Sequence, residues 1–146
     1  MEKLLAEKAI GYFEEGFNCS ESMFKAYLDV YKKDQSMAGA ASGFGGGIGG
    51  KGITCGAVSG AIMAIGLHFN RQSSSEKELY ATIRSKSLAM VDQFAQENGT
   101  SYCKDLIPYD LTTMEGREKL HNDKETLAKC KGLLTVASRL LAKSLE

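Results

Sequence analysis

Apolar side chains recur along most of the chain at intervals of three and four residues, which is the spacing of amphipathic helices. The first stripe predicts a helix over residues 2–15, ended by Gly16, and consists of Ala6, Ile10, Phe13 and Phe17. Asn18 and Glu21 have the spacing of a capping box, which predicts the start of a second helix. The stripe of that helix is Met23, Ala26, Tyr27, Val30 and Tyr31. The alanine-rich segment 34–42 predicts a further short helix.

The second half of the chain has the same periodicity. Ser75 and Glu78 predict the start of a long helix closed by Asn98-Gly99, with the stripe Leu79, Ile83, Met90 and Phe94. Two short helices are expected next, one ending near Pro108 and one capped by Thr112. The last helix is expected to open at Asn122, with the stripe Leu127, Cys130, Leu134, Ala137 and Leu141. No segment alternates apolar and polar residues, so we expect no sheet.

The segment Ile53–Phe69 contains no charged residue, which is typical of a helix buried on all sides. Its length approaches that of a membrane span, but we interpret it as the central helix of a bundle, capped by Thr54, and expect no stable membrane insertion. Small residues would let neighbouring helices approach it closely, namely Gly56, Gly60 and Ala64. The pattern therefore predicts an all-α, single-domain bundle over residues 1–146, with a glycine-rich loop before the central helix.

Composition narrows the class of protein. The chain has 146 residues, 43% hydrophobic and 25% charged, which is the range of a globular domain. Its 18 basic residues balance 18 acidic ones, so we expect no nucleic-acid partner. Charged residues interrupt the first 17 positions where a signal peptide needs an apolar core. We therefore expect a cytoplasmic location, where thiols are kept reduced.

Four cysteines carry the candidate chemistry, namely Cys19, Cys55, Cys103 and Cys130. No two of them form a Cys-x-x-Cys motif, so a joint site has to be assembled by the fold. The first three lie at predicted helix starts, where the helix dipole and free N–H groups favour a thiolate. Cys130 lies on the apolar stripe of the last helix and is expected to be buried. A purely structural role in packing stays open for all four.

The setting of these cysteines resembles the C_GCAxxG_C_C family. The glycine-rich loop leads into Cys55-Gly56-Ala57-Val58-Ser59-Gly60, with one cysteine before this element and two after it. The resemblance extends from Phe17-Asn18-Cys19 to Cys130 and so covers nearly the whole chain. It implies a redox-active protein whose four family cysteines correspond to Cys19, Cys55, Cys103 and Cys130. It implies no particular reaction or substrate.

The glycine-rich loop is a second candidate element. Gly45 to Gly52 approximates a phosphate-binding P-loop, but Gly52 stands where Ser or Thr is needed and no strand precedes the loop. We therefore do not expect nucleotide binding. The loop's N–H groups are instead expected to hold a small substrate beside Cys55, through Gly46, Gly47, Gly49, Gly50 and Lys51. The two histidines, His68 and His121, are interpreted as surface or helix-end residues.

The leading hypothesis is thiol/disulfide exchange with an unknown electron donor or acceptor. Cys55 is the expected reactive thiol, because it combines a helix start, Lys51 and an open glycine loop, and Cys19 is its expected partner. One alternative is a metal site in which all four thiolates hold an iron–sulfur cluster or zinc. The other is a binding module without catalysis or cofactor. The sequence leaves a homodimer open.

Overall fold

The computed structural model describes residues 1–146 as helices joined by short connections, with no strand. In chain order the elements are α1 (Glu2–Glu15), α2 (Cys19–Val30), the 3-10 helix η1 (Gln35–Phe44), α3 (Gly56–Phe69), α4 (Lys77–Asn98), α5 (Cys103–Leu106), α6 (Met114–His121) and α7 (Lys124–Ser144). The all-α prediction is therefore confirmed. The expected short helix over 34–42 forms as a 3-10 helix rather than an α-helix.

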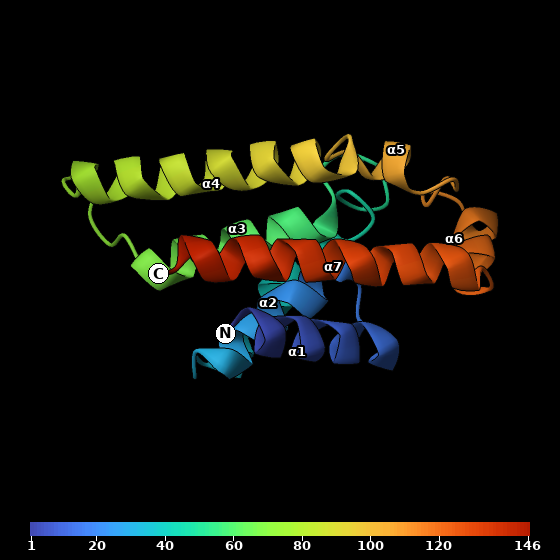
Figure 1. Ribbon diagram of the computed structural model, residues 1–146, viewed down its shortest axis with the longest axis horizontal. Helices are drawn as coiled ribbons and strands as arrows, with labels where there is room; N and C mark the ends of the chain where they lie inside the picture. Colours follow the sequence, from blue (N-terminus) through green and yellow to red (C-terminus); the bar gives the residue numbers. More distant parts are fainter.

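The helices form a layered bundle with one hydrophobic core. In Figure 1, α3 and α7 lie between the long helix α4 on one side and α1 with α2 on the other. The short helices α5 and α6 lie at the end of the bundle opposite the C-terminus (Figure 1). No helix combines the length and apolar character needed to cross a membrane. The charge-free segment instead contributes α3, which packs against α2, η1, α4 and α7.

Most helix ends follow the local chemistry of the sequence. The capping box at α2 is present: the Asn18 side chain accepts a hydrogen bond from the Glu21 backbone N–H at 2.9 Å, and the Glu21 carboxylate accepts one from the Asn18 N–H at 2.9 Å. Gly16 and Gly99 end α1 and α4 in the left-handed conformation, at φ 111° and 85°. Glycine reaches this region without the steric penalty of a side chain.

Four predicted N-cap residues are displaced by one residue each. The N-cap of α3 is Cys55 rather than Thr54, and that of α4 is Glu76 rather than Ser75. For α6 the cap is Thr113, whose hydroxyl accepts from the Gly116 N–H at 2.9 Å, not Thr112. For α7 it is Asp123 rather than Asn122. The Asp123 carboxylate accepts hydrogen bonds from both the backbone and the hydroxyl of Thr126. In both α6 and α7 the neighbouring oxygen that reaches the free N–H groups becomes the cap.

The predicted row of small residues on α3, Gly56, Gly60 and Ala64, lets this helix pack closely against α2. A methyl group added at Gly60 would lie 2.6 Å from the Ser20 carbonyl oxygen and 2.9 Å from the Met23 Cβ. One added at Gly56 would lie 2.9 Å from the Ser20 backbone nitrogen. Only glycine permits such a close approach of two helix backbones. The contact fixes the start of α2 beside the start of α3.

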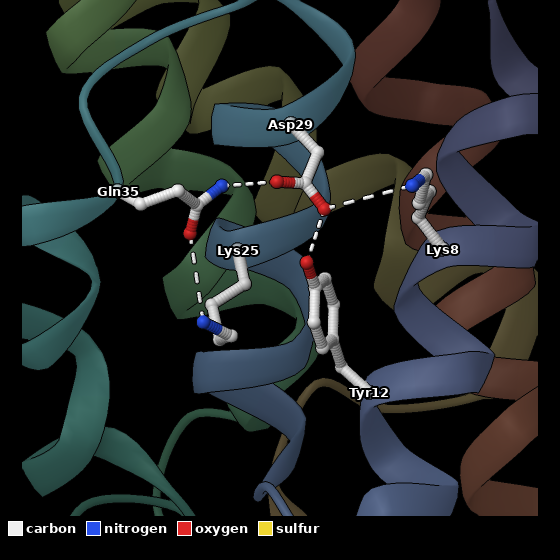
Figure 2. A network of polar contacts seen from close by, with 5 residues as sticks. All are labelled: Lys8, Tyr12, Lys25, Asp29 and Gln35. Carbon is white, nitrogen blue, oxygen red and sulfur yellow. Dashed lines mark hydrogen bonds and ion pairs between the residues drawn. The ribbon is translucent and has the colours of Figure 1, made fainter.

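A polar network fixes the other end of α2. Figure 2 shows the Asp29 carboxylate accepting hydrogen bonds from the Tyr12 hydroxyl of α1 and the Gln35 amide of η1. The Lys8 ammonium lies 3.8 Å from the same carboxylate. The hydrogen bond to Asp29 raises the pKa of Tyr12 to about 12, because it holds the proton on the phenol. Asp29 thus joins α1, α2 and η1 at the end of α2 remote from Cys19.

Candidate functional site

Cys19 and Cys55 meet because α2 and α3 start side by side. Cys19 is the first residue of α2, directly after the cap Asn18, and is half-buried. Cys55 is the residue that caps α3, and it is 3% exposed. A methyl group at Gly56 would lie 3.1 Å from the Cys19 Cβ, so the Cys-Gly sequence at the start of α3 permits this contact.

Cys103 is brought to Cys55 by a two-stranded backbone bridge. Thr54 and Tyr102 pair in antiparallel fashion. The Cys55 N–H donates to the Ser101 carbonyl at 2.8 Å, and the Cys103 N–H donates to the Ile53 carbonyl at 2.7 Å. Both cysteines therefore flank one bridge, although 47 residues lie between them in the sequence. The sequence carries no signal for this pairing, because a single bridge leaves no periodic pattern.

The glycine-rich loop folds tightly against these residues. Five consecutive residues, from Gly46 to Gly50, have positive φ, including Ile48 at 71°. A methyl group at Gly47 would lie 2.8 Å from the Cys103 Cβ, and one at Gly50 would lie 2.5 Å from the Leu111 carbonyl oxygen. The glycines are thus required by backbone conformation and by close packing.

Cys130 reaches the same place from the middle of α7, where it is 4% exposed. All four cysteines line one cavity of about 660 Å³, which is within the usual size range of small-molecule sites. Its wall contains the loop glycines Gly45, Gly46, Gly49 and Gly50 and many apolar side chains. The fold therefore gathers four thiols that are widely separated in the sequence.

The four thiols differ strongly in acidity. A hydrogen bond with the Cys130 side chain, together with burial, raises the pKa of Cys19 well above its usual value. The same hydrogen bond lowers the pKa of Cys130, and Lys129 adds to this effect against the opposing effect of burial. Burial raises the pKa of Cys55 to about 12 and that of Cys103 to about 11. The interaction between these two thiols thus favours the thiolate at Cys130 and the protonated thiol at Cys19.

Burial of Cys55 works against its expected role as the reactive thiol, which stays a prediction. The backbone N–H groups of Ala57 and Val58 do lower the pKa of Cys55, as its place at a helix start predicts. Burial has the larger, opposite effect, because removal of water disfavours the charged thiolate. Lys51 is not among the groups that shift this pKa. Cys130 has the lowered pKa instead, because its partner Cys19 stabilises the thiolate.

The other predicted site residues are divided between two places. Gly46, Gly49 and Gly50 line the cavity of the cysteines, whereas Gly47 packs behind it against Cys103. Lys51 is exposed and borders a smaller depression that adjoins the cavity, together with Lys104 and Asp110. His121 lies at the end of α6 and at the cavity. His68 lies near the end of α3, where the Tyr27 hydroxyl is 3.2 Å from its Nδ1.

The sequence did not predict the two cationic side chains at the cavity. Arg117 of α6 and Lys131 of α7 both line it. Lys131 follows Cys130 directly, so its proximity to that thiol could have been predicted from the sequence. Arg117 had no such signal, because its position depends on how α6 folds back over the loop.

The donor set does not form a ready-made metal centre. No group of three or more His, Cys, Asp or Glu side chains lies in an arrangement suited to hold a metal ion. The four thiols nevertheless share one cavity, and each of them shifts the pKa of at least one other.

Comparison with known proteins agrees with the arrangement of the cysteines. Residues 17–144 match the family model described as "Putative redox-active protein (C_GCAxxG_C_C)". An uncharacterized protein of Archaeoglobus fulgidus is 34% identical over 127 residues, which cover 78% of this chain and 84% of the relative. No solved structure matches. The matched range contains all four cysteines, and the chain belongs to the C_GCAxxG_C_C family.

Proposed function

We propose that the protein is a dithiol/disulfide redox protein in which Cys130 attacks and Cys19 resolves. The observation that carries this proposal is the cavity that all four thiols line, in which the interaction between Cys19 and Cys130 lowers the pKa of Cys130 and raises that of Cys19. Thiol exchange needs one sulfur as a thiolate and a second thiol within reach. Membership in a family described as redox-active supports the same conclusion.

The reaction transfers two electrons. The Cys130 thiolate attacks one sulfur of a substrate disulfide, whose S–S bond breaks and whose other sulfur leaves as a thiolate. The Cys19 thiol passes its proton to that leaving group, and its sulfur then attacks the Cys130 sulfur of the mixed disulfide. The second substrate sulfur leaves as a thiolate and takes its proton from water, so the products are a Cys19–Cys130 disulfide and two substrate thiols. Cys55 and Cys103 remain protonated, in keeping with their raised pKa values.

Disulfide mapping tests this proposal. Reduced protein is treated with one equivalent of a disulfide oxidant, and the cross-linked peptides are identified by mass spectrometry. We expect a Cys19–Cys130 cross-link in the wild type and in Cys55→Ser, and none in Cys130→Ser. A dominant Cys55–Cys103 cross-link would assign the chemistry to the other two thiols and overturn the proposal.

Anaerobic purification tests the alternative of a metal-bound state. We expect a colourless protein with four titratable thiols. Visible absorption accompanied by stoichiometric iron, or zinc that blocks the thiols until a chelator is added, would replace thiol exchange with a four-thiolate centre.

A further inference from the structure

The thiol pair lies inside a cavity rather than on a surface. Cys130 is 4% exposed, and neighbouring apolar side chains such as Leu106 and Leu133 are 4% and 3% exposed. The disulfide of a folded protein is attached to backbone on both sides, which hinders its entry. A cavity of about 660 Å³ does hold a small molecule. The cavity therefore favours small disulfides over the disulfides of folded proteins.

The charges at this cavity are predominantly positive. Arg117 and Lys131 line it, and Glu14 is its only acidic residue. Glu14 is paired with Lys131, whose ammonium lies 3.0 Å from the carboxylate. Arg117 has no acidic partner: none of the ion pairs of the chain includes it. Its positive charge is therefore uncompensated.

The position of Arg117 is fixed by the loop that borders the cavity. Its guanidinium donates a hydrogen bond to the Leu111 carbonyl at 3.1 Å. That carbonyl packs directly on Gly50, one of the cavity-lining glycines. One edge of the guanidinium is thus occupied, and its remaining N–H groups are available to an anion.

We infer that the cavity binds a small disulfide bearing a carboxylate or another anionic group, with Arg117 receiving the anion and Cys130 receiving the sulfur. The inference rests on the proposed exchange reaction and adds its substrate class. The apolar wall holds the carbon skeleton, and the open glycine backbone leaves room beside the sulfur. The disulfide is the oxidant: it takes two electrons from the thiol pair and leaves as two thiols, while Cys19 and Cys130 become a disulfide.

A set of three small disulfides of similar size tests this inference. The probes are dithiodipropionate, which is dianionic, 2-hydroxyethyl disulfide, which is neutral, and cystamine, which is dicationic. Reduced protein is mixed with each probe, quenched with acid, and the released thiol is quantified. Each rate is divided by the rate of the same probe with dithiothreitol, because leaving-group pKa values differ among the probes.

We expect the normalised rate to fall from the anionic to the neutral to the cationic probe, by about tenfold at each step at low salt. Arg117→Gln should bring the normalised rates of the anionic and neutral probes close together, so that most of this order is lost. Arg139→Gln is the matched control, since Arg139 pairs with Glu97 and does not line the cavity. Arg139→Gln should keep the same order of normalised rates as the wild type. A synthetic hairpin peptide closed by one disulfide should react more slowly than the neutral probe.

Two outcomes separate the failure of this inference from the failure of the exchange reaction. Equal normalised rates for the three probes, or a peptide that reacts as fast as the neutral probe, would overturn the substrate class alone. In Cys19→Ser, the mixed disulfide with the probe should accumulate on Cys130, as read by mass spectrometry. The absence of any adduct on Cys130 with all three probes would overturn the exchange reaction and the substrate class together.

Discussion

Cys19 and Cys130 show that the surroundings of a thiol affect its pKa more than its position in a helix does. Cys19, Cys55 and Cys103 all lie at helix starts, as the sequence predicts. The helix dipole is equivalent to about half a charge and is opposed by the loss of water around a buried thiolate. The neighbouring thiol of Cys19 has the largest effect on the pKa of Cys130 and makes it the lowest of the four. Cys19 lies in α2, far from Cys130 in the sequence. The sequence could identify the four thiols but not rank them.

The rate of alkylation across pH tests this ranking. A thiolate forms as the pH rises through the thiol pKa, so Cys130 should be labelled by iodoacetamide at lower pH than the other three cysteines. Cys103 and Cys55 should follow only near pH values of about 11 and 12. Cys19→Ala removes the hydrogen bond and should move the Cys130 labelling curve to higher pH. Cys19→Ser keeps a donor and should move it less. Mass spectrometry of each cysteine peptide gives the measurement, and earlier labelling of Cys55 would contradict the ranking.

At the scale of helices, the close contact of α2 with α3 determines where two of the cysteines meet. The spacing of Gly56, Gly60 and Ala64 predicted that contact from the sequence alone, because small residues at intervals of four form a smooth helix face. The helix that packs against this face could not be predicted, because the spacing of the small residues does not indicate that Ser20 is their neighbour.

Gly60→Ala tests the α2–α3 contact. Its methyl group would meet the Ser20 carbonyl and the Met23 side chain, so the helices must separate, and we expect a loss of about 1–3 kcal/mol in unfolding free energy. Gly66→Ala is the matched control on the same helix, because a methyl group there meets nothing within 4 Å. The control should gain up to about 1 kcal/mol from helix propensity. Urea unfolding followed by circular dichroism measures both, and equal effects would refute the role of the contact.

The glycine loop offers a second matched pair. Gly47 and Gly49 have φ values of 74° and 58°, so alanine carries a similar backbone penalty of about 1–2 kcal/mol at either site. Only at Gly47 would the methyl group also collide with Cys103 and the Ile53 nitrogen. Gly47→Ala should therefore expose Cys103 to alkylation, whereas Gly49→Ala should destabilise the protein without changing Cys103 labelling. Identical labelling in the two variants would show that the loop does not support the site.

At the scale of the whole molecule, the sequence predicted the class of fold better than the site. Periodicity gave the all-α bundle, and Asn18 and Glu21 gave the start of α2, because these signals are local. The Thr54–Tyr102 bridge, the run of positive φ through Ile48 and the position of Arg117 each depend on segments that meet only after folding. Ile48 is the clearest case, since a β-branched residue is rarely found in that conformation.

Oxidation of the thiol pair should stabilise the whole fold. A Cys19–Cys130 disulfide would close a loop of about 110 residues, and cross-linking a loop of that length lowers the entropy of the unfolded chain by an amount worth at most about 4–5 kcal/mol. The bond would also join the start of α2 to the middle of α7, two helices that pack together in the reduced fold. We therefore expect a higher urea midpoint for the oxidised than for the reduced wild type, measured by circular dichroism without reductant. The double variant Cys19→Ser/Cys130→Ser should show no such difference between oxidising and reducing conditions.

If oxidation stabilised that variant equally, the stabilising cross-link would lie at Cys55 and Cys103. If oxidation destabilised the wild type, the pair could not form a disulfide without straining the bundle.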